Sequence, residues 1–115
     1  MLIYKIFRAP EWAILQTNGE TFGAPVDLAD GYVHFSTGAQ VRETAAKWFA
    51  GEDNLRLLAI ESNTLGPHLK WEPSRGGALF PHLYRALTLE DLLWVKALPL
   101  APEGAGESHL FPEDL

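Results

Sequence analysis

The first residues that could do chemistry are a histidine and two hydroxyl side chains, His34, Ser36 and Thr37. They stand at the end of a β-branched and aromatic run, just before the expected start of a helix. An imidazole, two hydroxyls and unpaired backbone N–H groups within one turn can hold a ribose hydroxyl or a phosphate. The alternative is structural: His34 packs in the core, and Ser36 or Thr37 caps the helix.

The second group lies between residues 71 and 82 and combines an indole, a carboxylate, a guanidinium, two glycines and an imidazole. The guanidinium of the arginine and the exposed backbone of the neighbouring glycines can bind an anion. Glu72 stands where a strand meets this loop. The indole could stack on a base or a nicotinamide ring. In the alternative interpretation, the loop is a solvated turn that forms a salt bridge with Glu72, and the histidine only packs against its neighbours. The ligand-binding candidates of this group are Trp71, Arg75, Gly76, Gly77 and His82.

Both groups place polar side chains at strand ends beside glycines, so we expect the His34 strand and the segment from Glu72 to Arg75 to line one cleft. Other chemical templates find little support. The chain has no cysteine, and its four histidines lack the close spacing of metal ligands, so no metal site is predicted. The phosphate-binding pattern GxGxxG and the nucleophile elbow GxSxG do not occur.

The length and the net charge of the chain restrict the classes of protein to which it can belong. The 115 residues carry 9 Lys+Arg against 15 Asp+Glu, a net charge of -6. This is the size of one globular domain, and its acidic balance argues against a nucleic-acid partner. No stretch approaches the ~20 apolar residues that span a bilayer. The first residues lack the pattern of a signal peptide, so we expect a cytoplasmic protein without a membrane partner.

The elements of the first half must position the His34 group. Residues 2–7 predict a buried strand, Pro10 opens a helix that Asn18-Gly19 ends, and residues 20–30 predict a loop. After a strand over residues 32–36, Thr37 and Gln40 form a capping box for a helix over about residues 38–50. Its apolar stripe predicts burial of Val41, Ala45, Trp48 and Phe49.

The second half is richer in strands. Residues 55–61, 69–72, 84–87 and 93–98 predict strands, residues 73–81 predict a loop, and Thr88 caps a turn. Trp12, Trp48 and Trp94 are expected in the core. Helices gather in the first half, so strict βαβ alternation is broken, and the fold class is α+β with a mixed or antiparallel sheet and two main helices. We expect one domain over residues 1–100 and a loosely ordered tail over 101–115.

In combination, these segments resemble an uncharacterised family of small bacterial proteins, the domain of unknown function 952. The resemblance covers most of residues 2–98. Its motifs are the Ile-Tyr-Lys-Ile start, the segment Asp30-Gly31-Tyr32-Val33-His34-Phe35-Ser36-Thr37, Gln40-Val41 with Thr44-Ala45, Leu69-Lys70-Trp71-Glu72, and Arg75-Gly76-Gly77 through Phe80-Pro81-His82-Leu83-Tyr84.

The resemblance implies a fold similar to the ADP-ribosyltransferases, a split β-sheet clasping a cleft. In those enzymes a histidine on an early strand contacts the ADP-ribose, and His34 looks like its counterpart, with Phe35 where those enzymes often have glycine. The catalytic glutamate of that fold has Glu72 as its candidate here. The related RNA 2'-phosphotransferases use several arginines and a histidine, a set that Arg75 and His82 match in part.

The first reading is a polar cleft that binds or acts on a nucleotide or an ADP-ribose-like ligand, with NAD or ADP-ribose as the molecule that the resemblance implies. As a transferase or glycohydrolase, the protein would work at the ribose anomeric carbon, with His34 and Glu72 as the catalytic residues. The second reading is a non-catalytic small-ligand or protein-interaction module on the same scaffold. The third is a general acid–base hydrolase that uses His34 or His82 with Glu72. The oligomeric state is not fixed by the sequence.

Overall fold

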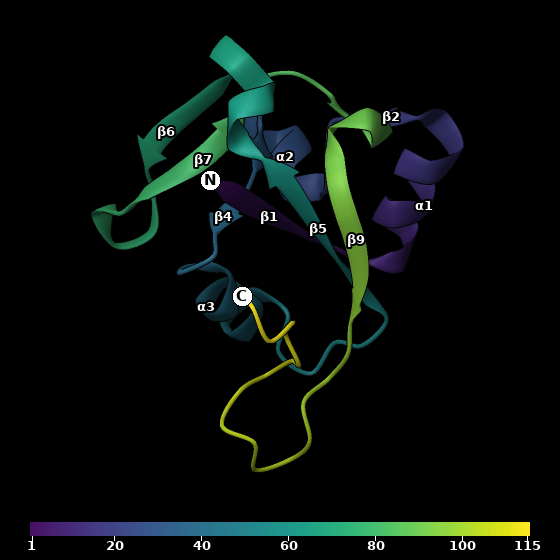
Figure 1. Ribbon diagram of the computed structural model, residues 1–115, viewed down its shortest axis with the longest axis vertical. Helices are drawn as coiled ribbons and strands as arrows, with labels where there is room; N and C mark the ends of the chain where they lie inside the picture. Colours follow the sequence, from purple (N-terminus) through teal and green to yellow (C-terminus); the bar gives the residue numbers. More distant parts are fainter.

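The computed structural model describes the backbone of residues 1–115 and every side chain except that of Arg75. Three α-helices, three 3-10 helices and nine strands make up the described chain (Figure 1). The helices are α1 (Ala9–Asn18), α2 (Pro25–Asp30), α3 (Val41–Trp48), η1 (Ser62–His68), η2 (Arg75–Gly77) and η3 (Leu89–Asp91). The strands are β1 (Leu2–Phe7), β2 (Glu20–Thr21), β3 (Val33–His34), β4 (Ser36–Thr37), β5 (Leu55–Glu61), β6 (Leu69–Pro73), β7 (Leu79–Leu83), β8 (Leu87–Thr88) and β9 (Leu92–Leu98).

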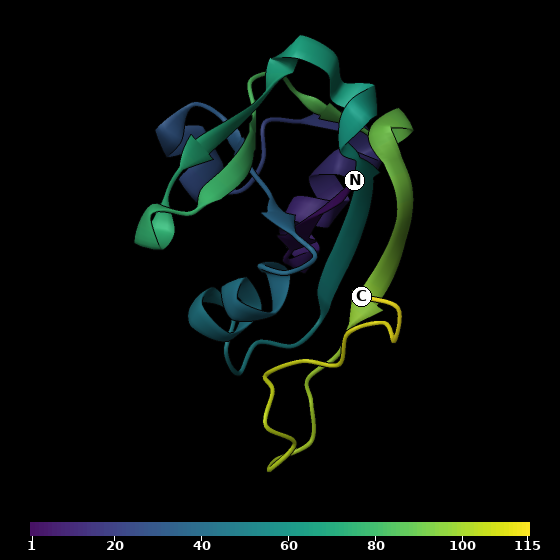
Figure 2. The same ribbon diagram turned by 60° about the vertical axis from the view of Figure 1, so that its left-hand side comes forward.

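The strands form three antiparallel sheets, so the predicted α+β class is confirmed. A four-stranded sheet has the order β4-β1-β5-β9, a three-stranded sheet has the order β3-β7-β6, and β2 pairs with β8. Only Phe35 separates β3 from β4, so the chain passes there from one sheet to the other. In both views the β6–β7 hairpin lies on the opposite side of the molecule from β9, with α3 below the hairpin (Figures 1 and 2).

Strand alternation divides the core into two clusters on the two faces of the four-stranded sheet. On β1, Ile3 and Phe7 belong to one cluster, and Tyr4 and Ile6 belong to the other. Lys5 shares the face of Ile3 and Phe7, and it is buried there. A buried charge at such a position needs a partner of opposite charge, and Asp27 of α2 provides it.

The segment of residues 20–30 was predicted as a loop, and this is wrong for most of its length, because it contains β2 and α2. Pro25 stands in the first turn of α2, and the Asp27 carboxylate accepts the N–H of Ala24 at the helix start. Gly31 ends the helix in the left-handed conformation, with φ 85°. A helix of six residues is too short for its apolar periodicity to be visible in the sequence.

Helix α3 is shorter than the predicted 38–50, because residues 37–40 form a turn in which the Gln40 side chain accepts the N–H of Thr37. Val41 and Ala45 are buried as predicted. Burial of Trp48 was a wrong prediction: the residue is 62% exposed. It continues the stripe of Val41 and Ala45, but the helix ends there, beyond the part that packs on the sheet.

The strands of the second half agree with the sequence except around β7. Strands β5, β6 and β9 and the Thr88 cap lie where they were predicted. Strand β7 begins at Leu79, so Phe80 and Pro81 belong to a strand rather than to the loop. It ends at Leu83, and of the strand predicted over residues 84–87 only Leu87 lies in a strand, β8. Pro81 has no N–H to donate to the sheet, and its carbonyl accepts the N–H of Phe35.

Residues 101–115, expected to be loosely ordered, return to the domain in the structure. His109 is fully buried and its Nε2 lies 2.7 Å from the carbonyl oxygen of Glu52. Phe111 and Leu115 pack against the core cluster of Tyr4 and Ile6. The order of this segment in solution stays a prediction. In the described part of the chain, no helix is long and apolar enough to cross a membrane.

Candidate functional site

The three-stranded sheet has one apolar and one polar face. Side chains alternate along each strand, and directly paired residues share a face. His34 of β3 pairs with His82 of β7, and His82 pairs with Lys70 of β6. The polar face therefore carries the two histidines, with Glu72 two residues from Lys70 and Tyr84 two residues from His82. On the other face, Val33, Leu83 and Leu69 join the core.

Histidine and tyrosine rings pack together on this polar face. The Tyr32 ring lies 4.5 Å from the His34 ring, 4.2 Å from the His82 ring and 5.1 Å from the Tyr84 ring, measured between centroids. The two histidine rings meet edge to face at 5.2 Å. Tyr32 thus fixes the spacing of the two imidazoles.

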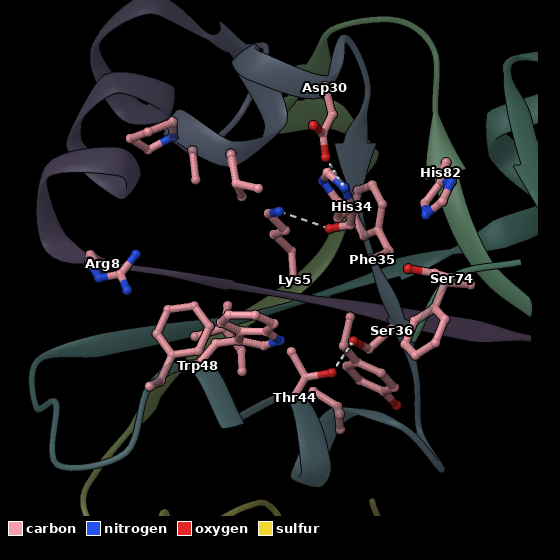
Figure 3. Close-up of a pocket in the computed structure, with 18 residues that line it drawn as sticks. Lys5, Arg8, Asp30, His34, Phe35, Ser36, Thr44, Trp48, Ser74 and His82 are labelled. Carbon is pink, nitrogen blue, oxygen red and sulfur yellow. Dashed lines mark hydrogen bonds and ion pairs between the residues drawn. The ribbon is translucent and has the colours of Figure 1, made fainter. Parts of the chain in front are cut away.

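A cavity of about 560 Å³ opens between this sheet, β1, α3 and the start of α2 (Figure 3). Its volume lies in the range of small-molecule sites. In Figure 3, Trp48 and Thr44 lie on the α3 side, and His34 and His82 lie on the strands above them. The residues that line it are Tyr4, Lys5, Ile6, Arg8, Ala24, Pro25, Val26, Asp30, His34, Phe35, Ser36, Val41, Thr44, Trp48, Phe49, Ser74, Phe80 and His82.

His34 is held between two carboxylates. Its Nδ1 lies 2.6 Å from Oδ1 of Asp27, and its Nε2 lies 3.0 Å from Oδ2 of Asp30. Carboxylates accept hydrogen bonds, and an imidazole donates from both nitrogens only when it is protonated. Both ring nitrogens of His34 thus face carboxylate oxygens.

Asp27 connects His34 to Lys5 through a buried ion pair. Its Oδ2 lies 2.8 Å from Nζ of Lys5, which also donates to the carbonyl oxygen of His34 at 2.8 Å. Burial alone would raise the pKa of Asp27, but the hydrogen bond from His34 and the charge of Lys5 hold that pKa below its usual value. Burial lowers the pKa of Lys5, against the opposing charge of Asp27. Asp27 therefore holds both Lys5 and the Nδ1 side of His34 in place.

His82 differs from His34, because a carboxylate contacts only one of its ring nitrogens among the described residues. Its Nδ1 lies 2.8 Å from Oε1 of Glu72, which also accepts the Tyr84 hydroxyl at 2.6 Å. The hydrogen bonds from Tyr84 and His82 hold the pKa of Glu72 below its usual value, so its carboxylate is an acceptor and Nδ1 donates. The buried Nε2 of His82 has no hydrogen-bond partner among the described residues.

Hydroxyl groups lie on the cavity wall near the histidines. Ser36 Oγ and Thr44 Oγ1 form a hydrogen bond of 2.9 Å, and Thr44 also donates to the carbonyl of Gln40. Ser74, at the end of β6, is part of the same wall. The cavity wall thus combines an imidazole held by two carboxylates, an imidazole with one unpaired nitrogen among the described residues, and hydroxyl groups that can bind a polar ligand.

The structure brings together part of the sequence-predicted site. His34, Ser36 and His82 line the cavity. Glu72 is not among the lining residues, but its carboxylate contacts Nδ1 of His82. Among the described residues, the cavity wall does not include Thr37 or Trp71, nor the exposed glycines Gly76 and Gly77. Trp71 stands one residue from Glu72 and therefore on the other face of its strand. The Arg75 side chain lies outside the described residues, so its role as an anion ligand stays a prediction.

Four residues of the site were not predicted as functional from the sequence: Lys5, Asp27, Tyr84 and Trp48. Lys5 is the only charge in an apolar strand run, a signal for a buried ion pair. The alternation of Phe80, His82 and Tyr84 was a signal too, since every second residue shares a face. No comparable signal points to Trp48. Among the described residues, no group of three or more acidic, cysteine or histidine side chains could hold a metal ion.

Comparisons with known proteins agree with the architecture. The family model described as "Protein of unknown function (DUF952)" matches residues 6–95. A crystal structure of protein CC0527 from Caulobacter crescentus is 49% identical, with a TM-score of 0.88, over 96% of this chain and 94% of that chain. A solution NMR structure of CC0527 is 52% identical, with a TM-score of 0.80, over 90% and 89% of the two chains. The comparison with curated proteins gave no match.

Proposed function

The chain belongs to the DUF952 family, whose description names no activity, and we propose that its cavity binds a nucleotide or an ADP-ribose-like molecule and that His82 acts on it as a general base. One observation carries this proposal. His82 lines the cavity, and its buried Nε2 has no hydrogen-bond partner among the described residues, while Glu72 fixes the other nitrogen of the ring. A buried polar atom without a partner costs free energy, so a ligand that donates a hydrogen bond there is stabilised.

The pairing of His82 with Glu72 suits proton transfer. A carboxylate on Nδ1 holds the ring in the tautomer whose Nε2 accepts a proton, and it stabilises the cation formed afterwards. Tyr84 holds the same carboxylate oxygen in place. In this proposal His82 is catalytic, and Glu72 and Tyr84 are positioning residues.

The volume of the cavity and the residues that line it support a ligand of the nucleotide class. A volume of about 560 Å³ suits a molecule of nucleotide size. Aromatic side chains on the wall suit a planar ring, and the hydroxyls of Ser36 and Ser74 suit a sugar. The ring nitrogens of His34 are occupied by Asp27 and Asp30. A ligand phosphate that displaces the exposed Asp30 would gain the Nε2–H of His34.

The resemblance to ADP-ribosyltransferases directs the proposal to ribose chemistry. Two antiparallel sheets that separate at Phe35, with His34 on an early strand, are compatible with it. Glu72 was expected to stabilise an oxocarbenium-like centre, but its Oε1 is engaged by His82 and Tyr84. We therefore assign proton transfer to His82 rather than charge stabilisation to Glu72.

The proposed reaction is hydrolysis or transfer at the anomeric carbon. Nε2 of His82 takes a proton from water or from an acceptor hydroxyl, and that oxygen forms a bond to the anomeric carbon. The bond to the leaving group breaks, and its electron pair departs with the leaving group. The non-catalytic module remains the second candidate. It is favoured by one observation: Lys5, Asp27 and His34 are engaged with one another rather than open to a substrate.

Calorimetric titration of NAD, ADP-ribose, AMP and ribose 5-phosphate tests the proposal. The His82→Leu variant should lose affinity about tenfold or more, since a hydrogen bond to a buried acceptor is removed. His68→Ala, an exposed histidine outside the cavity wall, is the matched control and should bind like the wild type. Release of nicotinamide from NAD, measured by chromatography, separates catalysis from binding alone. Binding without turnover favours the second candidate, and no binding of any probe contradicts the proposal.

A further inference from the structure

Trp48 is a large apolar side chain with an unusual position. Its residue is 62% exposed, although it lines the cavity and continues the buried stripe of Val41 and Ala45 on α3. A tryptophan that faces water at the wall of a cavity leaves much apolar surface uncovered. In the described part of the chain, the indole has no aromatic or cationic partner.

The neighbourhood of Trp48 is apolar. Pro25 and Val26, at the start of α2, line the same cavity, and Val26 is itself exposed. Phe49 follows Trp48 in the chain and also lines the wall, but the Arg8 guanidinium covers its ring at 4.6 Å. Of these two neighbouring rings, the indole is therefore the one open to a ligand.

The charge at this side of the cavity is already neutralised. Arg8 donates to both carboxylate oxygens of Glu52, at 2.7 and 3.0 Å, so its fork is occupied. A ligand phosphate would gain little binding free energy from Arg8, because it would compete with Glu52 for the guanidinium. A neutral planar ring fits better, because it can cover the indole without disturbing the pair.

The open polar acceptor is on the other side of the cavity. In Figure 3, Trp48 lies on the α3 side near Arg8, whereas His82 lies across the cavity beyond His34 and Phe35. A ligand that uses both sides must join a planar ring to a polar, hydroxyl-bearing part. A nucleoside has this composition.

We infer that Trp48 is the platform on which the planar ring of the ligand stacks, so that the ligand class is a ring-bearing nucleoside derivative rather than a simple sugar phosphate. This inference rests on the proposed function and adds the residue that selects for the ring. It also moves the stacking role from Trp71, which the sequence suggested, to Trp48. Trp71 is 38% exposed but stands outside the cavity wall.

Calorimetric titration of ADP-ribose into the wild type and three variants tests the inference. Stacking of a base on an aromatic side chain contributes enough that Trp48→Ala should weaken binding about tenfold or more. Trp48→Phe keeps a ring and should stay within about threefold of the wild type. Trp71→Ala, the matched control, should bind like the wild type.

A fluorescence measurement covers the case in which Trp48→Ala fails to fold. ADP-ribose should quench part of the tryptophan emission of the wild type, and Trp48→Phe should bind with that quenching lost. Wild-type affinity in Trp48→Ala, an equal loss in Trp71→Ala, or unchanged quenching in Trp48→Phe overturns the inference and leaves the proposed function standing. If ADP-ribose does not bind the wild type, both are overturned.

Discussion

Nδ1 of His82 lies 2.8 Å from Oε1 of Glu72, across the pair of strands β6 and β7. The same oxygen accepts the hydroxyl of Tyr84 at 2.6 Å. One carboxylate oxygen therefore receives two donors, and both ring orientation and tautomer of His82 follow from it. This relationship leaves Nε2 as an acceptor in the cavity wall.

Replacing Glu72 by Gln should release the tautomer of His82. The glutamine amide can turn its NH2 group towards Nδ1, and the ring proton then moves to Nε2. Nitrogen-15 chemical shifts of the His82 ring would register the change, and ADP-ribose affinity should fall about tenfold. Glu103→Gln, an exposed change in the C-terminal segment, is the control. An unchanged Nδ1–H tautomer in Glu72→Gln would show that Glu72 does not set it.

Tyr84 should titrate at unusually high pH. The hydrogen bond to the Glu72 carboxylate raises the pKa of Tyr84 from 10.0 to about 12. Because this pKa is raised in the folded protein, the contribution to stability is complete below pH 10 and is lost as the pH rises through 12. Ultraviolet titration of tyrosinate should show a step near pH 12 that is absent in Tyr84→Phe. A Tyr84 step at the ordinary pH of tyrosine would contradict the hydrogen bond.

Removing one partner of the buried Lys5–Asp27 pair should destabilise the protein strongly. Asp27→Asn leaves the Lys5 ammonium in the core with a neutral partner, and such changes cost about 3–5 kcal/mol. The free energy of unfolding from urea titration measures the loss. Asp53→Asn, an exposed aspartate, should change it by less than about 0.5 kcal/mol. A small loss in Asp27→Asn would indicate that the pair is not buried in solution.

The same pair gives a pH dependence with a defined sign. The pKa of Asp27 is lowered in the folded protein from its ordinary value of 3.8, so its carboxylate contributes fully to stability above about pH 3.8. The contribution is lost as the pH falls through the lower, folded-state pKa. Thermal melts below pH 4 should therefore fall more steeply in the wild type than in Asp27→Asn. Parallel curves for the two proteins would contradict the lowered pKa.

Trp48→Ala should have little effect on folding. The residue is 62% exposed, so the loss should stay below about 1 kcal/mol. Leu58→Ala, a fully buried change in β5, should cost about 2–5 kcal/mol and serves as the comparison. Denaturant titration of both variants checks the difference. A loss in Trp48→Ala equal to that of Leu58→Ala would place the indole in the core.

Most of the fold could be predicted from local signals. Strands β1, β5 and β9 are long runs rich in apolar residues, and Pro10 and Gly19 mark the ends of α1. Helix α2 could not be found by periodicity, because it is held by one long-range carboxylate, Asp27, rather than by an apolar stripe. Tertiary contacts decide such short elements.

The candidate site was predicted in its residue types but not in its connections. His34 and His82 were identified from their neighbours in the chain, yet their pairing depends on the register between β3 and β7. Glu72 was expected to act directly on the ligand, and its contacts with His82 and Tyr84 depend on the pairing of β6 with β7, which the sequence does not reveal. Trp48 shows the limit of the helical stripe: periodicity gives the side of a helix but not how far the packed surface extends.

The proposed function depends on Nε2 of His82 accepting a hydrogen bond from the ligand. Long-range proton–nitrogen NMR of the four histidine rings, recorded during titration with ADP-ribose, tests it most directly. We expect a His82 ring protonated at Nδ1 in the free protein, with a large shift of its Nε2 resonance as ADP-ribose binds and none at His68. An Nε2 resonance of His82 that does not move at saturating ADP-ribose would contradict the proposed function.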